Sequence, residues 1–255
     1  MIRNLLLDLD GTVYRGREEV PGAARFVAAL RARGIRHLFV TNRANRTPAA
    51  ICEHLRGYGI ACEEADVLTS AQATAQRLPP GRAFCIGEEG LRMALEQAGF
   101  RMVERDADYV IVSFDRAFDY ARLERACRLI QAGARFVATN TDRCLNTEQG
   151  LVPGTGAIVA AVAAGSGVEP LVIGKPEPLI FESALERLGA ARAETIAVGD
   201  SLATDIPAGR RAGLRTALML TGVSSAADLA RAAEAPTWVC RTFEDLAAIV
   251  WPEAP

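Results

Sequence analysis

The chain alternates apolar runs of strand length with longer segments in which apolar residues recur at helical spacing. Residues 2–10 predict a buried strand, and residues 23–33 predict a helix. Residues 35–40 predict a second strand, and Pro48 lies in the first turn of the next helix. This order predicts a parallel sheet covered by helices, with functional groups at the carboxyl ends of its strands.

The same alternation restarts after Leu78-Pro79-Pro80-Gly81 and again near Leu171. The predicted strands of the middle section are residues 83–86, 109–114 and 135–138, and its predicted helices are residues 90–98, 120–132 and 157–164. In the last section we expect strands at residues 171–173, 195–198, 216–220 and 237–240, and helices at residues 178–188, 205–212 and 243–250. The first and last sections, residues 1–78 and 171–255, then form one sheet that the middle section, residues 79–170, interrupts.

Composition removes several classes of function. The 255 residues are half hydrophobic and carry a formal net charge of -2, with Lys and Arg scattered along the chain, so we expect no nucleic-acid partner and no membrane surface. Six cysteines without metal-binding spacing predict free thiols in a reducing compartment. No apolar run is long enough for a signal peptide or a membrane span, so we expect a soluble, cytoplasmic protein. The patterns do not reveal its oligomeric state.

The first predicted strand stops at two carboxylates, Asp8 and Asp10, and Gly11 follows them. Asp is disfavoured inside strands, so the strand ends at Asp8 and Asp10 enters a turn. Two like charges this close repel each other unless a cation or a hydrogen bond offsets them. The pair is open to three interpretations, namely a bound metal, an acid/base pair or a solvated turn.

Polar residues follow the carboxyl ends of four predicted strands, and each has an ordinary explanation as a turn, a cap or a solvated loop. They are Asp8 with Asp10, Thr41 with Asn42, Lys175, and Asp200 with Asp205. Together they suit one chemistry. Several carboxylates suit Mg2+, a lysine and a hydroxyl suit phosphoryl oxygens, and a carboxylate nucleophile beside a second carboxyl group suits transfer through an aspartyl phosphate.

Four segments in this order resemble the motifs of the haloacid dehalogenase (HAD) superfamily. They are Asp8-Leu9-Asp10-Gly11-Thr12, Val40-Thr41-Asn42, Gly174-Lys175-Pro176 and the stretch from Gly199-Asp200 to Asp205-Ile206. The middle section resembles the NagD-like, para-nitrophenylphosphatase-type branch, subfamily IIA. The segments that carry this second resemblance begin at Thr69, Ile86, Asp115, Ala138 and Pro153.

The resemblance implies an α/β fold, with a Rossmann-like parallel-sheet HAD core and a large inserted α/β cap. It also implies Mg2+-dependent hydrolysis of a small phosphate monoester. Asp8 is then the nucleophile and Asp10 the general acid/base, while Thr41 and Lys175 hold the phosphoryl group with the Asn42 backbone nearby. Dehalogenating relatives lack a carboxylate at the position of Asp10, so its presence favours phosphatase chemistry.

The metal ligands implied by the resemblance are Asp8, the Asp10 carbonyl and Asp200, with Asp205 supporting the site. A nucleoside monophosphate, a sugar or polyol phosphate and pyridoxal phosphate all remain open as substrates. Two other functions are compatible with the same motifs. One is a phosphotransferase or mutase that uses the same covalent intermediate, and the other is a non-catalytic binding member of the fold.

Residues of the middle section are expected to set specificity, because the core motifs act on any phosphate ester. The candidates are Asp115, Asn140 and Asp142, which follow predicted strand ends, and residues 154–156, whose glycines allow a close backbone approach. Arg43 stands where the branch usually has a small or amide residue. It could contact a distal anion of the substrate or be solvated.

Overall fold

The computed structural model describes residues 2–147 and 150–252, and its contacts divide the chain into two compact units. The first unit comprises Met1–Thr41, Ala49–Leu68 and Lys175–Pro255. The second unit comprises Asn42–Pro48 and Thr69–Gly174. The chain therefore leaves the first unit after Thr41, returns to it at Ala49, leaves it again after Leu68 and returns at Lys175.

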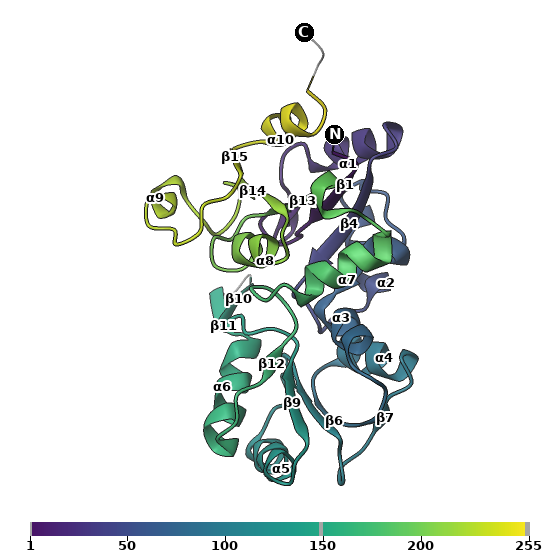
Figure 1. The fold of residues 1–255 in the computed structure, drawn as a ribbon, viewed down its shortest axis with the longest axis vertical. Coiled ribbons are helices and arrows are strands. Elements are labelled where there is room, and N and C mark those ends of the chain that lie inside the picture. The colour runs from purple at the N-terminus through teal and green to yellow at the C-terminus, as the bar shows by residue number, and fades with distance from the viewer. Residues whose placement is uncertain (1, 148–149, 253–255) are drawn as a thin grey trace. The chain divides into compact units, whose positions relative to one another are not determined.

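A six-stranded sheet forms the centre of the first unit, in the order β15-β14-β13-β1-β4-β5 (Figure 1). Its strands are β1 (Asn4–Leu7), β4 (Arg36–Thr41), β5 (Val67–Thr69), β13 (Thr195–Gly199), β14 (Arg215–Met219) and β15 (Trp238–Cys240). β1 pairs in parallel with both β4 and β13, so that Leu7 lies opposite Phe39 and Val198. The residues that follow these three strands therefore meet at one edge of the sheet.

Helices cover the sheet of the first unit on both faces, which explains why all four residues of β1 are buried. The covering helices are α1 (Ala23–Ala32), α2 (Pro48–Arg56), α7 (Leu179–Leu188), α8 (Asp205–Arg211) and α10 (Phe243–Val250). The unit also has the short helix α9 (Ala226–Leu229), which buries none of its residues, and the 3-10 turns η1 (Glu64–Asp66) and η2 (Arg192–Glu194). Leu5 and Leu7 pack in one core cluster with residues of α1, α2 and α10. α7 lies against β4, and α8 lies against β13 and β14.

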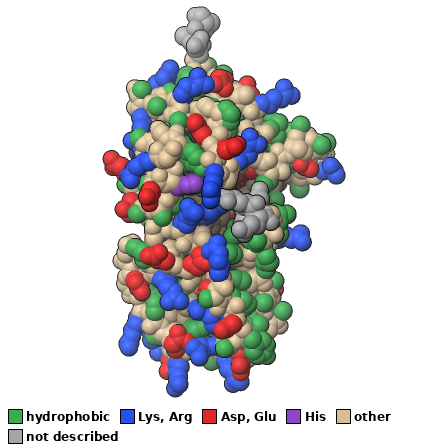
Figure 2. Space-filling model, turned by 180° about the vertical axis from the view of Figure 1, so that it is seen from behind, with side chains coloured by type: hydrophobic (Ala, Val, Ile, Leu, Met, Phe, Trp, Pro, Cys, Tyr) green, Lys and Arg blue, Asp and Glu red, His purple; other side chains and the backbone are tan. Residues whose placement is uncertain are grey.

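The second unit has its own parallel sheet, in the order β12-β9-β8-β6-β7. Its strands are β6 (Arg82–Ile86), β7 (Arg101–Met102), β8 (Tyr109–Val112), β9 (Arg135–Ala138) and β12 (Leu171–Val172), and its helices are α3 (Ser70–Arg77), α4 (Glu89–Gln97), α5 (Tyr120–Gln131) and α6 (Thr155–Ser166). α6 packs on α5 and exposes Ala157, Ala160 and Ala164, and hydrophobic side chains gather along this side of the unit (Figure 2).

Two short antiparallel hairpins complete the fold. β2 (Tyr14–Arg15) pairs with β3 (Glu18–Glu19) between the first strand and α1. β10 (Cys144–Thr147) pairs with β11 (Gly150–Pro153) in the second unit, and no sequence pattern predicted it. Within the described ranges, none of the helices has both the length and the apolar character that a bilayer crossing requires.

The structure corrects the bounds of the first strand. β1 ends at Leu7, one residue before the end that the aspartates predicted at Asp8, whereas the apolar pattern predicted a strand over residues 2–10. Leu9 is apolar and fully buried, but its carbonyl accepts the amides of Thr12, Val13 and Tyr14 in a tight turn. The pattern therefore continued past the strand because a buried turn carries the same apolar signal as a buried strand.

The second unit begins earlier than the sequence boundary at residue 79. Helix α3 belongs to it, and no helical pattern predicted this helix. Thr69 caps α3 by accepting the Gln72 amide at 3.2 Å, while the Gln72 side chain accepts the Thr69 amide at 3.0 Å. This Thr-x-x-Gln capping box was the sequence signal for the helix. The assignment of the two units to a catalytic core and a specificity cap stays a prediction.

Candidate active site

Asp8 is the residue at which the chain leaves β1. Its amide donates to the carbonyl of Val198 at 2.8 Å, which fixes the backbone against β13. Its side chain is buried, and its Oδ1 accepts a hydrogen bond from Lys175 Nζ. Burial, and then the nearby carboxylates of Asp205 and Asp200, raise the pKa of Asp8, while Lys175 opposes that rise. A carboxylate in this position stays ionised only if positive charge is close to it.

Asp200 follows β13, and its carboxylate fills space that is open only because two neighbouring residues are glycines. A Cβ atom at Gly222 would lie 1.8 Å from Asp200 Oδ2, and one at Gly11 would lie 2.2 Å from the same oxygen. That oxygen also accepts the Val223 amide at 2.6 Å. The carboxylate is thus fixed from three sides by backbone, and Gly11 additionally has a φ of 83°, which favours glycine.

Asp205 is the first residue of α8. Its Oδ2 accepts the Ser201 amide at 3.1 Å, and its Oδ1 accepts Lys175 Nζ at 2.6 Å. A Cβ atom at Gly199 would lie 2.2 Å from Asp205 Cγ, so the carboxylate packs directly against the end of β13. The spacing of Gly199, Asp200 and Asp205 therefore brings both acids to one point of the sheet edge.

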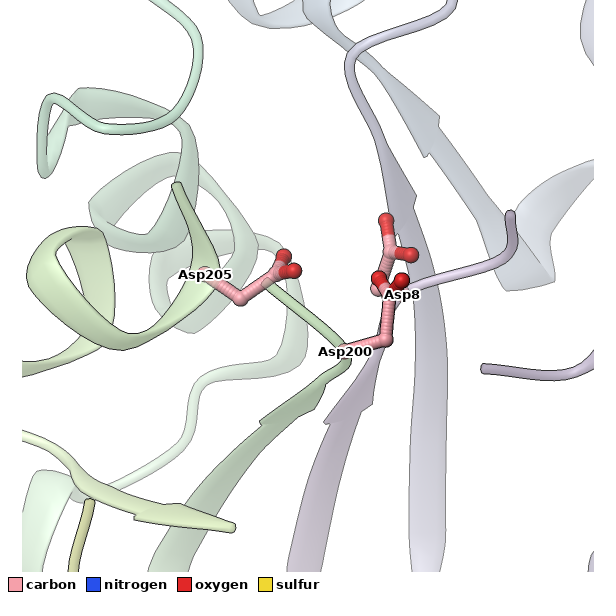
Figure 3. A group of neighbouring side chains, drawn as sticks. All are labelled: Asp8, Asp200 and Asp205. Atoms are coloured by element: carbon pink, nitrogen blue, oxygen red, sulfur yellow. The ribbon is translucent and has the colours of Figure 1, made fainter. Parts of the chain in front are cut away.

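The side chains of Asp8, Asp200 and Asp205 converge, as Figure 3 shows. Among the described residues they form a group whose ligand oxygens lie within 4.8 Å of one another. Burial, followed by the charge of Asp205, raises the pKa of Asp200 to about 7. Three buried carboxylates this close repel one another, and oxygen donors of this kind suit a hard divalent cation. The residues present therefore fit a divalent metal.

Lys175 supplies fixed positive charge at the same place. Its Nζ donates to Asp8, to Asp205 and, at 3.3 Å, to the carbonyl of Val40 near the end of β4. Burial disfavours the charged amine, but the carboxylates of Asp205 and Asp8 outweigh this and raise the pKa of Lys175. Thr41, the last residue of β4, is buried at the neighbouring strand end. The structure thus brings together four of the predicted site residues and places Thr41 beside them in the sheet order.

Asp10 lies in the turn after β1, and its side chain is half-buried. Among the described residues it does not belong to the group of three converging carboxylates. Its Oδ2 accepts the Tyr14 hydroxyl at 3.4 Å. No sequence signal pointed to Tyr14, or to Gly222, because their importance comes from proximity to Asp10 and Asp200 in space.

Three of the predicted residues in the second unit form hydrogen bonds with one another. The Asn42 side chain donates to the Asp142 carboxylate at 3.1 Å, and the Asn140 side-chain Nδ2 donates to the Asn42 backbone carbonyl at 2.9 Å. Asn140 Oδ1 in turn accepts the Asp142 amide at 3.1 Å. The Asn42 side chain therefore belongs to a network of the second unit, and Asp142 is its half-buried member.

Asp115 has a different environment. It is buried, and its two carboxylate oxygens accept the amides of Gly87 at 3.0 Å and Ala117 at 2.9 Å, while Arg122 lies 3.6 Å from Oδ2. The glycines at 154 and 156 also have structural partners, since Cβ atoms there would lie 2.3 Å from the Asp142 carbonyl and 2.4 Å from the Thr141 carbonyl. The close backbone approach expected at these glycines is thus to their own unit.

Comparisons with known proteins agree with this geometry. The model of the haloacid dehalogenase-like hydrolase family matches residues 5–101, and a HAD-hydrolase-like model matches residues 172–246. The chain is 41% identical over 239 residues to the 5'-nucleotidase YutF of Bacillus subtilis, and the aligned region covers 92% of this chain and 93% of that protein. It is 40% identical over 247 residues to the acid sugar phosphatase of Staphylococcus aureus, covering 94% of each chain. The crystal structure of a 4-nitrophenylphosphatase from Thermotoga maritima superposes with a TM-score of 0.93, at 33% identity over 98% of both chains.

Proposed function

The chain belongs to the haloacid dehalogenase family of hydrolases and is a phosphoric monoester hydrolase, and from this premise we propose a Mg2+-dependent reaction that passes through an aspartyl phosphate. The observation that carries the proposal is the buried Asp8 carboxylate, which contacts Lys175 and lies beside two further carboxylates. A carboxylate held next to fixed positive charge can approach an anionic phosphate, which an isolated carboxylate would repel.

In the first step Asp8 attacks phosphorus, and the bond between phosphorus and the ester oxygen breaks. The leaving alkoxide takes a proton from Asp10, so that the products are a neutral alcohol and phosphorylated Asp8. Lys175 and Thr41 hold the phosphoryl oxygens, and Lys175 offsets the negative charge gathered on them. Lys175 keeps its proton for this task because two carboxylates face it.

In the second step a water molecule attacks the phosphorus of the aspartyl phosphate. Asp10, now ionised, takes the proton of that water, and the products are free phosphate and regenerated Asp8. The same side chain thus serves first as an acid and then as a base. Its place in a turn outside the crowded group of carboxylates suits both tasks, because it can reach the ester oxygen without sharing the metal site.

Asp8, Asp200 and the Asp10 carbonyl would hold the metal ion, with Asp205 supporting them through Ser201 and Lys175. When bound, Mg2+ supplies positive charge that offsets the repulsion between Asp8 and the phosphate. We prefer Mg2+ to softer metals because the donors are all carboxylate or carbonyl oxygens.

We propose small phosphate monoesters as substrates, and the second unit as the part that discriminates among them. The relatives are named for nucleotides, sugar phosphates and 4-nitrophenyl phosphate, which share only the phosphate monoester. The half-buried Asp142 is the predicted specificity residue with the most accessible side chain, whereas Asp115 and Asn140 are occupied by contacts to backbone. The six free cysteines of the chain suit a reducing compartment, and we therefore propose that the reaction takes place in the cytoplasm.

A phosphate-release screen tests the proposal. Purified protein with Mg2+ is assayed against nucleoside monophosphates, sugar and polyol phosphates, pyridoxal phosphate and 4-nitrophenyl phosphate, with water as the only acceptor. We expect release from several esters, lost on addition of EDTA. Turnover that appears only when an alcohol acceptor is added would instead identify a phosphotransferase. No turnover of any ester, with or without acceptor, would contradict the proposal.

A further inference from the structure

We propose that Tyr14 is a positioning residue that orients the Asp10 carboxyl group for protonation of the leaving group. This inference rests on the proposed function, because it assigns a task within that reaction. Three observations carry it: the turn that returns Tyr14 to Asp10, the hydrogen bond between the two side chains, and the aromatic contacts that fix the Tyr14 ring.

The turn after β1 is tied at several points. The amides of Thr12, Val13 and Tyr14 donate to the Leu9 carbonyl at 3.2, 2.8 and 3.2 Å. In the opposite direction the Gly11 amide donates to the Tyr14 carbonyl at 2.7 Å, and Asp10 and Tyr14 form an isolated bridge. The backbone therefore holds residues 10 and 14 side by side, which brings the Tyr14 hydroxyl within 3.4 Å of Asp10 Oδ2.

The Tyr14 ring cannot turn freely, because it is 4% exposed and lies between two other rings. The His54 ring of α2 meets it edge-on, with centroids 4.8 Å apart at 86°, and the Tyr58 ring stacks at 5.8 Å and 30°. Tyr58 is itself fixed, since its hydroxyl donates to the Gly16 carbonyl at 3.2 Å and lies 3.2 Å from His54 Nε2. The hydroxyl of Tyr14 thus has a defined position set by α2 and the first hairpin.

This position has a consequence for the chemistry of Asp10. The Asp10 side chain is half-buried, and a hydrogen bond to one of its oxygens restricts the rotation of its carboxyl group. A hydroxyl that donates to Oδ2 makes that oxygen an acceptor and favours the other carboxyl oxygen as the one that carries the proton. An acid must lie within hydrogen-bond reach of the oxygen it protonates, so the orientation that Tyr14 selects sets how often the transfer succeeds.

The test compares two aryl phosphates whose leaving groups differ in basicity. kcat/KM reports the reaction only through transfer of the phosphoryl group to Asp8, which is the step in which the leaving group departs. The 4-nitrophenolate ion is stable without a proton, whereas phenolate is more basic and depends on the acid. For Tyr14→Phe, which keeps the ring and removes the hydroxyl, we expect kcat/KM to fall about fivefold with phenyl phosphate and less than about twofold with 4-nitrophenyl phosphate.

Four further variants make the result specific. Tyr120→Phe removes a hydroxyl from a side chain that is 78% exposed and should change neither rate. Asp10→Asn should show the same preference for 4-nitrophenyl phosphate in a stronger form, and adding Tyr14→Phe to it should have no further effect on the ratio of the two rates. Tyr58→Phe, which loosens the support of the Tyr14 ring, should give a smaller loss in the same direction and serves if Tyr14→Phe does not fold.

An equal loss with both substrates, or no loss with either, would overturn the assignment of Tyr14. The assignment would also be overturned if Tyr14→Phe changed the ratio of the two kcat/KM values as strongly in the Asp10→Asn variant as in the wild type. An inactive wild-type protein would contradict the proposed function instead, so the two failures are distinguishable.

Discussion

Both units place acidic or amide side chains at the carboxyl ends of parallel strands, yet they use them differently. In the first unit Asp8 and Asp200 follow β1 and β13, and their carboxylates converge with a third one around Lys175. In the second unit Asp115 and Asn140 come shortly after β8 and β9, and their side chains are taken up by backbone amides and carbonyls.

The difference lies in what surrounds each charge. Asp115 has two amide donors and Arg122, which stabilise an ordered carboxylate without need of a ligand. Asp8 and Asp200 are buried beside like charges, and this raises the pKa of each. A strand end alone therefore does not identify a catalytic acid. Crowding of buried carboxylates that the protein alone does not balance is the more informative feature.

The largest effect that would separate the two regions is expected from Asp8→Asn. The amide is close in size but cannot form the acyl phosphate, so turnover should fall by about 10^4-fold or more. Rapid quench with labelled substrate should trap phosphate on wild-type Asp8 and not on the variant, while circular dichroism shows an unchanged fold. Near-normal hydrolysis by Asp8→Asn would contradict the mechanism.

Removal of metal is expected to have the next largest effect. EDTA should reduce activity to background and Mg2+ should restore it, because the three carboxylates and the substrate phosphate repel one another without a cation. Ca2+ should inhibit, since its larger and looser coordination shell misplaces Asp8. Full activity in EDTA, with no metal found by elemental analysis, would contradict this prediction.

A pair of alanine variants tests the second unit. Asp115→Ala leaves the buried Gly87 amide and the Ala117 amide without their acceptor and removes the carboxylate beside Arg122, so it should lower the free energy of unfolding by about 1–3 kcal/mol, measured by chemical denaturation. Asp142→Ala removes a half-buried acceptor and should change the ratio of kcat/KM between two good substrates by about three- to tenfold, with little loss of stability. If both variants lost the same stability and changed the ratio of kcat/KM equally, the two residues would not differ in role.

The smallest effect concerns the pH dependence of stability without metal. The pKa of Asp200 in the folded protein, about 7, lies above its unfolded value of about 3.9, so the folded state binds more protons in this interval. The contribution of Asp200 is therefore fully present below pH 4 and is lost as the pH rises through 7. In EDTA, the difference in melting temperature between pH 5 and pH 8 should be smaller for Asp200→Asn than for the wild type. An unchanged difference would show that Asp200 does not titrate in this range.

The sequence by itself determined most of the elements and the positions of the core motifs. Apolar runs of strand length located β4, β6, β8 and β13, because buried parallel strands are apolar on both faces. The order of strands and helices also required that Asp8, Thr41 and Asp200 meet at one edge, since consecutive parallel strands share their direction. Local signals therefore sufficed to place these three residues at strand ends.

Other features were decided only by the tertiary structure. Helix α6 is apolar on all sides, so no pattern could tell that Ala157, Ala160 and Ala164 would be exposed. The position of the Asp200 carboxylate depends on Gly222 and the Val223 amide, and the position of the Tyr14 ring beside Asp10 depends on the His54 ring of α2. Asp115 and Asp200 both follow strands in the sequence. What distinguishes them is the set of charges and amides that folding gathers around each, because Coulombic and desolvation energies depend on distance in space and not on spacing along the chain.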